Sequence, residues 1–350
     1  PSMRYANVCI ESIGYELPKQ VVTSAEIETR LAPLYDRLQL PYGRLELMSG
    51  IRERRFWDDG TAPSDVASLA GHKALEQAGV FGQEIDCIIN CSVSRDFLEP
   101  ATASVVHERL KISPRAMLFD ISNACLGMLN GMVMLGNMIE LGQITRGLLV
   151  AGENAKPLVE TTIRQLLADP TMTRKKFKDA FASLTIGSGA AAIVMAHTSV
   201  AKHGHLLSGG AARTDSEQNH LCRGSADTGL DSDSRAEMST QSEELLHRGC
   251  ELAGRTWADF RQDLGWRDAD VSKTFCHQVG VAHRRLLFET LKLDPAIDFP
   301  TVEFLGNMGS VSLPITMALS IEAGNVQRAE KLALLGIGSG LNCLMLGVTW

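Results

Sequence analysis

The chain has 350 residues, 45% of them hydrophobic and 21% charged, and a formal net charge of −7 at pH 7. This composition is typical of a globular protein large enough for two α/β layers or two fused halves. An acidic balance without a dense Lys/Arg block argues against nucleic-acid binding, and no charge-free apolar run is long enough to cross a membrane. The eight cysteines are scattered without a Cys-x-x-Cys motif, so we expect free thiols, a reducing cytoplasmic compartment and no metal site.

Helix-like and strand-like segments alternate along the first half of the chain, which predicts an α/β fold. Residues 65–78 have the spacing of an amphipathic helix, with Ser64 as its N-cap and Gly79 as its stop. The next elements are predicted, in chain order, as a strand over 85–93, a helix over 101–110, a strand over 116–121, a helix at Cys125, a strand over 147–153 and a strand pair over 184–196.

The second half of the chain repeats features of the first. Residues 140–152 and 322–338 each contain a helix end, a glycine, a short turn with an arginine and an apolar strand. Aligning the two glycines gives a shift of 182 residues, which places Cys125 on Asn307. An internal duplication of this kind predicts two similar α/β halves whose equivalent turns meet at a common face.

A polar, turn-rich tract over 222–244 predicts a surface loop or flap, followed by a helix that ends at Leu264. Residues 78–91 then resemble residues 264–277, which places His277 near the end of a strand. We therefore expect Cys125, His277 and Asn307 to converge. The predicted halves are residues 3–198, with Cys125, and residues 199–350, with His277 and Asn307.

Cys125 stands among small residues at the predicted start of an apolar helix, in the stretch DISNACLGMLNGM. The free N–H groups and partial positive charge of a helix N-terminus stabilise a thiolate, and small neighbours let a substrate carbonyl approach. Taken alone, Cys125 fits a buried structural thiol better than a nucleophile. Its alignment with Asn307 favours a nucleophile.

Three further features offer groups that could serve such a nucleophile. His277, at a strand end, can take a proton from a thiol or donate to a developing oxyanion, although a lone histidine is often a surface or core group. Asn307 either supplies a left-handed turn or offers a neutral amide to an enolate oxygen. The glycine-rich loop in LLGIGSGLNC (334–343) is followed by no long helix, so it fits an oxyanion hole better than a phosphate cradle.

Together these motifs resemble the signatures of the thiolase superfamily, specifically its β-ketoacyl synthase III branch. The matching segments, in order along nearly the whole chain, are GIRERRFW (50–57), NACLG (123–127), IGSGAAAIV (186–194), HQVG (277–280), GNMGS (306–310) and GIGSGLN (336–342). The resemblance implies a five-layer αβαβα fold with two pseudo-duplicated halves, a homodimer, and CoA thioesters as substrates without a further cofactor. It implies that Cys125 is acylated, that His277 and Asn307 polarise the second thioester, and that the N–H groups of Cys125 and Ser339 form an oxyanion hole.

Some positions depart from the usual pattern of this branch. Val279, Gly280 and Ser188 replace its Ala, Asn and Asp, and Glu99 replaces an apolar residue on a loop that reaches the partner's acyl pocket. A malonyl substrate forms its carbanion by losing CO₂, whereas a simple acyl thioester must lose an α-proton to a base. A carboxyl buried in an apolar tunnel has a raised pKa and suits that role, and the alternative is a solvated loop carboxylate.

The segments SVSRDFLEP (92–100) and GIGSGLNC (336–343) also resemble OleA-type enzymes of long-chain olefin biosynthesis. Those enzymes join two fatty acyl-CoA molecules without decarboxylation into a 2-alkyl-3-ketoacyl-CoA. The resemblance implies that Glu99 enters the neighbouring subunit's site as the base. Rival functions are a decarboxylating synthase that uses malonyl-acyl carrier protein, a thioesterase with the Cys-His-Asn order of papain-like proteases, and a non-catalytic scaffold.

Several weaker candidates concern substrate binding. Methionines after Cys125, among them Met128, could line an acyl channel or simply pack in the core. Arg284 and Arg285 could meet the phosphates of CoA or of a carrier protein, or form a solvated helix face. The amphipathic insertion over 156–184 could enlarge a pocket or make dimer contacts.

Overall fold

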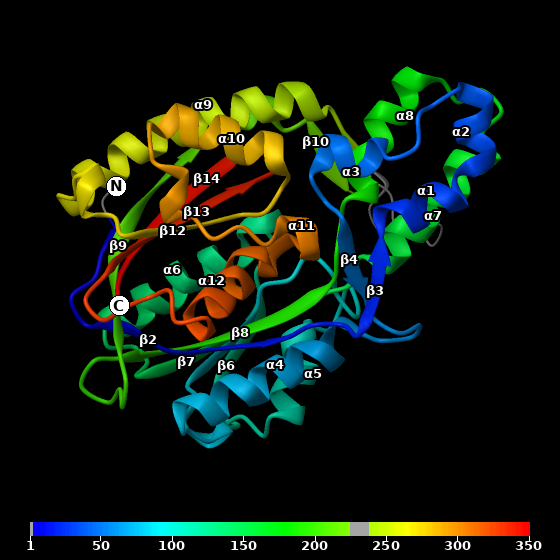
Figure 1. Cartoon of the computed structure of the whole chain (residues 1–350). Coiled ribbons are helices and arrows are strands. Elements are labelled where there is room, and N and C mark those ends of the chain that lie inside the picture. Colours follow the sequence, from blue (N-terminus) through cyan, green and yellow to red (C-terminus); the bar gives the residue numbers. More distant parts are fainter. Residues whose placement is uncertain (1–2, 225–237) are drawn as a thin grey trace.

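Two β-layers separate three layers of helices in the computed structural model, which describes residues 3–224 and 238–350 (Figure 1). The middle layer holds α6 (Gly127–Glu140) and α12 (Ser312–Glu322). One outer layer holds α4 (Pro63–Ala78) and α5 (Thr102–Arg109), and the other holds α9 (Ser242–Leu264) and α10 (Val281–Leu291). The predicted αβαβα order is confirmed.

The strands of both β-layers belong to one continuous ladder, in the order β12-β13-β14-β9-β2-β8-β7-β5-β6, with β1 beside β9. Strand β2 connects the layers because it pairs along its length with β8 but meets β9 only at Cys9 and Ile10. The strands are β1 (Met3–Arg4), β2 (Val8–Glu16), β5 (Cys87–Asn90), β6 (Met117–Asp120), β7 (Arg146–Glu153), β8 (Gly189–His197), β9 (His205–Thr214), β12 (Lys273–Cys276), β13 (Lys331–Gly338) and β14 (Asn342–Thr349).

The middle helices are apolar on nearly all sides because each packs between two β-layers. Met128, Met132 and Met138 of α6 are buried in this central core, with Met128 fully inaccessible to solvent. The flexible thioethers therefore fill space between the two sheets. This burial agrees with the packing interpretation, and a role of Met128 in an acyl channel stays a prediction.

The structure shows the repeat directly. Strand β5 runs parallel to β7, and β12 runs parallel to β13 in the equivalent position of the second half. The helices before them, α4 and α9, both end at a glycine with positive φ, 64° at Gly79 and 66° at Gly265. The same is true of Gly142 (70°) and Gly324 (75°), the two residues whose alignment revealed the repeat. The boundary between residues 198 and 199 stays a prediction.

Several element boundaries differ from the predictions, and three of the differences have an identifiable cause. Helix α4 begins at Pro63, not at Asp65, because proline suits the first helical position and the Asp65 carboxylate accepts the Ala62 N–H at 2.8 Å. The predicted strand pair over 184–196 is the single strand β8, because the chain before it turns aside to contact Asn307 and Arg55. The predicted loop over 222–244 contains β10 (Cys222–Gly224) and β11 (Met238–Thr240), which pair with each other, and residues 225–237 lie outside the described residues.

A further group of short helices forms a core of its own beside the five layers (Figure 1). It unites the predicted insertion with residues near the N-terminus, where Arg30 and Glu160 form two short hydrogen bonds of 2.7 and 2.6 Å. This packing explains the amphipathic pattern of the insertion within one protomer. The elements are β3 (Gln20–Thr23), α1 (Ser24–Arg30), α2 (Ala32–Leu38), α3 (Arg44–Ser49), β4 (Glu53–Phe56), α7 (Lys156–Ala168) and α8 (Arg174–Ala180).

All eight cysteines are free thiols, as predicted. Among the described residues, no helix is long and apolar enough to span a bilayer. No group of three or more His, Cys, Asp or Glu side chains in the same part of the chain could hold a metal ion.

Candidate active site

Cys125 lies in a short 3₁₀ turn, Ala124–Leu126, directly before α6. Ala124 has a φ of 47°, in the left-handed region that a residue with a side chain rarely adopts. The next turn packs closely on the end of β5, where a Cβ added to Gly127 would lie 1.9 Å from the carbonyl oxygen of Cys91. Only glycine permits this approach, so the small residues of the motif seat the cysteine on the strand end.

The C-terminal glycine loop lies beside Cys125. A Cβ added to Gly338, at the end of β13, would lie 3.6 Å from the backbone nitrogen of Cys125. Asn342, the first residue of β14, donates from Nδ2 to the Ser339 carbonyl oxygen (3.2 Å) and to Oδ1 of Asn123 (3.4 Å). The structure thus brings together the two loops predicted to form the oxyanion hole. Sequence reasoning missed Asn123 and Asn342, although both stand inside the matching motifs.

His277 follows β12, and its backbone N–H donates to the Leu335 carbonyl of β13 at 3.0 Å. The side chain is buried, and its Nδ1 has no hydrogen-bond partner among the described residues. Burial, with a smaller contribution from His283, lowers the pKa of His277 to about 3. The imidazole is therefore neutral near pH 7 and can accept a proton or donate its own.

Asn307 lies between two glycines that provide the turn. Gly306 and Gly309 have φ values of 66° and 60°, whereas Asn307 has no positive φ, so the left-handed-turn interpretation of Asn307 is wrong. Its Oδ1 accepts the Gly309 N–H at 2.9 Å, which leaves the NH₂ group as the donor of this side chain. The turn that follows, Gly309–Val311, packs against the Cys125 turn. The turn that contains Cys125 and the turn that follows Asn307 are therefore in contact.

Glu153, which sequence reasoning missed, ends the fully buried strand β7 beside this site. Its carboxylate accepts hydrogen bonds from the N–H of Val93 (2.7 Å), from the N–H (3.1 Å) and Oγ (3.0 Å) of Ser94, and from Oγ of Ser310 (2.6 Å). Burial raises the pKa of Glu153 more than these bonds lower it. The available signal was an acidic residue at the end of an apolar run.

The expected thiolate at Cys125 is contradicted. Burial and the nearby charge of Glu153 raise the pKa of Cys125 to about 12. Desolvation disfavours the thiolate more strongly than the start of α6 favours it. The resting nucleophile is thus a thiol, and neutral His277 is the group predicted to receive its proton.

The protonation state of Cys125 predicts the pH dependence of its alkylation. A group with a raised pKa is almost fully protonated at neutral pH, so the thiolate fraction grows about tenfold per pH unit. We expect the rate of iodoacetamide labelling at Cys125, followed by peptide mass spectrometry, to rise without a plateau from pH 6 to pH 10. A plateau below pH 8 would show that the helix N-terminus does create a stable thiolate.

Of the other predicted site residues, Arg284 lines a small pocket together with His277. Glu99 is exposed in the protomer, and the structure brings it to none of the other predicted residues of the described chain. Arg284 pairs with the buried Asp298 at 2.6 Å and donates to the Pro295 carbonyl, so its guanidinium has structural partners instead of a free position for phosphate. Arg285 is exposed on the same helix. Met128 is in the core, as described above.

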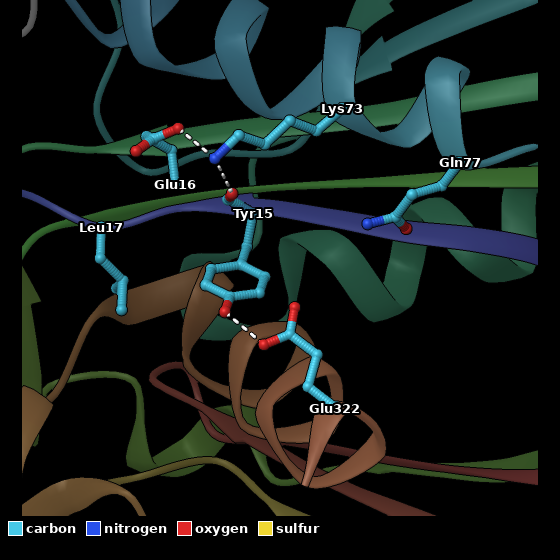
Figure 2. Close-up of a pocket in the computed structure, with 6 residues that line it drawn as sticks. All are labelled: Tyr15, Glu16, Leu17, Lys73, Gln77 and Glu322. Carbon is cyan, nitrogen blue, oxygen red and sulfur yellow. Dashed lines mark hydrogen bonds and ion pairs between the residues drawn. The ribbon is translucent and has the colours of Figure 1, made fainter. Parts of the chain in front are cut away.

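A separate surface pocket lies at the far end of α12 (Figure 2). Tyr15 donates to Glu322 at 2.7 Å, and Lys73 pairs with Glu16 and with the Tyr15 carbonyl, so its polar groups satisfy one another. Glu322 lies ten residues after Ser312 in α12, about 15 Å along the helix axis. The pocket is thus distinct from the Cys125 site. Its lining residues are Tyr15, Glu16, Leu17, Lys73, Gln77 and Glu322.

Comparison with known proteins gives consistent matches over the whole chain. Residues 119–215 match the 3-oxoacyl-[acyl-carrier-protein] synthase III family, and residues 262–350 match its C-terminal region. The acyl-CoA:acyl-CoA alkyltransferase of Shewanella oneidensis is 42% identical over 99% of this chain and 100% of its own.

Two solved structures of Xanthomonas campestris OleA superpose with a TM-score of 0.93 at 38% identity. One is a glutamate-to-glutamine variant and covers 99% of this chain and 98% of its own. The other is a cysteine-to-serine variant with bound lauric acid and lauroyl-CoA, and covers 99% of this chain and 100% of its own.

Proposed function

The chain belongs to the 3-oxoacyl-[acyl-carrier-protein] synthase III family, and from this premise we propose that it joins two fatty acyl-CoA molecules by a non-decarboxylative Claisen condensation. The product is a 2-alkyl-3-ketoacyl-CoA, and one CoA is released. The observation that carries the proposal is the contact between the Cys125 turn and the turn after Asn307, in a chain that also carries His277 at a strand end and Glu99 on an exposed loop. A decarboxylating enzyme needs no such base.

In the first half-reaction, the sulfur of Cys125 attacks the thioester carbonyl of one acyl-CoA. The pKa of Cys125 is too high, and that of His277 too low, for a proton transfer before attack, so the thiol proton passes to neutral His277 as the carbon–sulfur bond forms. The backbone N–H groups of Cys125 and Ser339 hold the oxyanion. The carbon–sulfur bond to CoA breaks, and the proton leaves with CoA as its free thiol. An acyl-Cys125 thioester remains.

In the second half-reaction, Glu99 of the partner subunit removes an α-proton from a second acyl-CoA. The NH₂ group of Asn307 and the imidazole of His277 donate to the enolate oxygen. The α-carbon forms a bond to the carbonyl carbon of acyl-Cys125, and the bond to sulfur breaks. The proton held by Glu99 returns to the cysteine sulfur, which restores both groups.

The proposed enzyme is a homodimer in which the two copies exchange Glu99 loops. Strand β6 lies at the end of the ladder with an unpaired edge, which invites pairing with a second copy. Exposed apolar side chains gather on β6 and on the neighbouring loop, as expected of a surface that a partner covers. They are Val93, Phe97, Leu98, Met117 and Leu118.

The cellular setting follows from the same chemistry. Eight free thiols support a reducing, cytoplasmic location. The product class is the one expected at the entry to long-chain olefin biosynthesis. The reaction needs CoA thioesters and no further cofactor, and acyl carrier protein is the alternative carrier for the second acyl group.

The test is incubation with lauroyl-CoA alone. We expect a β-keto product and free CoA without CO₂ release, detected by mass spectrometry. The variant Glu99→Gln should still acylate Cys125 but lose condensation by about 10²- to 10⁴-fold, because it lacks the general base. The matched control is Glu108→Gln, because Glu108 is an exposed carboxylate on the adjacent helix α5. This variant should leave the rates of Cys125 acylation and of condensation unchanged.

Two other outcomes would replace the proposal. Condensation that requires malonyl-acyl carrier protein and releases CO₂ identifies a decarboxylating synthase. Release of free lauric acid without a new carbon–carbon bond identifies a thioesterase.

A further inference from the structure

Glu153 is a buried carboxylate without a cation. Its exposed fraction is 5%, and no ion pair to it occurs within residues 3–224 and 238–350. Buried carboxylates are rare unless a charge or several hydrogen bonds compensate them. Here four hydrogen bonds do so, and the Trp57 indole N–H donates to the backbone carbonyl of the same residue at 2.9 Å. Because burying a carboxylate costs desolvation free energy, packing alone does not explain the position of Glu153.

The four hydrogen bonds come from two loops that the proposed reaction uses. Val93 and Ser94 begin the loop that carries Glu99, and Ser310 belongs to the turn that follows Asn307. Oε1 alone accepts both the Val93 N–H and the Ser310 hydroxyl, so a single atom joins the two loops. The carboxyl also lies against the Asn307 turn, because a Cβ added to Gly309 would be 3.4 Å from Cδ of Glu153.

The remainder of the Glu99 loop is anchored at its far end. The Asp96 carboxylate accepts the Ser64 N–H at 2.9 Å, and its own N–H donates to Oγ1 of Thr102 at 3.2 Å. Between these anchors, Phe97, Leu98 and Glu99 are exposed. The position of Glu99 in its own protomer is therefore set by the Glu153 contacts and Asp96, which precede it in the chain, and by the bond from Asp96 to Thr102, which follows it.

We propose that Glu153 is a positioning residue for the condensation step. It holds two segments of its own protomer together: the turn that carries Asn307, and the loop that carries Glu99 into the active site of the neighbouring protomer. The proposal rests on the function proposed above. Through this carboxylate, the amide donor of one active site and the base of the other share a single rigid link. Acyl transfer to Cys125 uses neither Glu99 nor Asn307, so Glu153 acts on the second half-reaction.

Two substitutions separate positioning from general structural support. In Glu153→Gln the amide oxygen can keep the Val93 and Ser310 bonds, but the NH₂ group then faces the Ser94 N–H. In Glu153→Leu all four bonds are lost. Ser310→Ala removes only the hydrogen bond from Ser310 to Glu153, and so only the link to the Asn307 turn. It replaces Glu153→Leu in the test if that variant does not fold.

We expect the rate of lauroyl-CoA condensation to fall about tenfold in Glu153→Gln and in Ser310→Ala, and about 100-fold in Glu153→Leu. The rate of Cys125 acylation, measured by intact mass, should not fall in any of them. Removal of the Glu153 charge should also speed iodoacetamide labelling of Cys125 at a given pH, which loss of packing alone does not explain.

Glu28→Gln is the matched control. Glu28 is also buried and accepts hydrogen bonds from the Tyr35 hydroxyl and from the N–H groups of Gly43 and Leu45, but it lies among the short helices. Its substitution should lower stability without changing the ratio of condensation to acylation. An equal loss of both steps in Glu153→Gln, or an unchanged ratio, would overturn the proposal.

Hydrogen exchange tests the link without substrate. We expect amide exchange to accelerate about tenfold over residues 91–96 in Glu153→Gln, which loses a hydrogen bond to Ser94, and over residues 306–311 in Ser310→Ala, which loses the bond to Glu153. Unchanged exchange in both segments would overturn the proposal even if activity fell. Failure of the proposed function is distinct, since it shows as absence of condensation in the unsubstituted protein.

Discussion

Replacing Cys125 with alanine abolishes both acyl transfer and condensation, with an expected loss on the order of 10⁴-fold or more. Without the sulfur, no covalent intermediate forms, and the second acyl-CoA has no electrophile to attack. The Cα-to-Cβ framework of the 3₁₀ turn is retained, so the fold should persist. The measurement is intact mass after incubation with lauroyl-CoA, which shows one added acyl group in the unsubstituted protein and none in Cys125→Ala.

Cys222 provides the control for this experiment. Cys125 and Cys222 are the two cysteines that are only partly buried, so they are the thiols most open to acylation or alkylation. Cys222→Ala should keep acyl transfer and condensation within about twofold of the unsubstituted rates. If acylation persists in Cys125→Ala but disappears in Cys222→Ala, the acylated residue is Cys222, and the assignment of Cys125 as the nucleophile is refuted.

Replacing Arg146 with methionine should destabilise the protein by about 3–5 kcal/mol. Arg146 begins β7, and its Nε lies 2.7 Å from the Glu11 carboxylate of β2, with both side chains almost fully buried. The same guanidinium donates to the Val200 carbonyl at 3.0 Å. Without the arginine, the Glu11 charge is left buried and uncompensated, which carries a large desolvation cost. The measurement is the free energy of unfolding in guanidinium chloride.

A double variant shows whether the charge left behind is the cause. Glu11→Met with Arg146→Met removes both charges, and we expect it to recover most of the lost stability, because an apolar pair of similar volume often replaces a buried ion pair without loss. Lys111→Met breaks the exposed pair with Glu108 and should leave the midpoint unchanged. A midpoint for Arg146→Met equal to that of Lys111→Met would contradict the prediction.

Residues with strong local signals were predicted well. The helix that ends at Gly79 and the strand containing residues 147–153 follow from hydrophobic spacing and a glycine stop. The repeat in the sequence predicts the observed contact between the Cys125 turn and the turn after Asn307. The first two features depend on residues that are neighbours in sequence, and the third depends on a similarity between the two halves. Both kinds of signal can be read from the sequence alone.

Other features failed because their cause lies far away in sequence. The segment before β8 was predicted as strand from its apolar composition, but it leaves the ladder to meet Asn307, more than 100 residues later. Arg284 looked available for phosphate, yet it pairs with Asp298, which folds back against it. Local patterns contain no information about such partners.

The sequence by itself determined the chemistry available to this protein: a thiol, an imidazole, an amide and a glycine loop in repeated positions, and a carboxyl where a base would be needed. Only the tertiary structure decided the protonation states of those groups and the hydrogen bonds around them. It made Cys125 a thiol and His277 neutral, because desolvation depends on everything packed around a side chain. It also gave Glu153 its four hydrogen bonds, since these come from segments that only folding brings together.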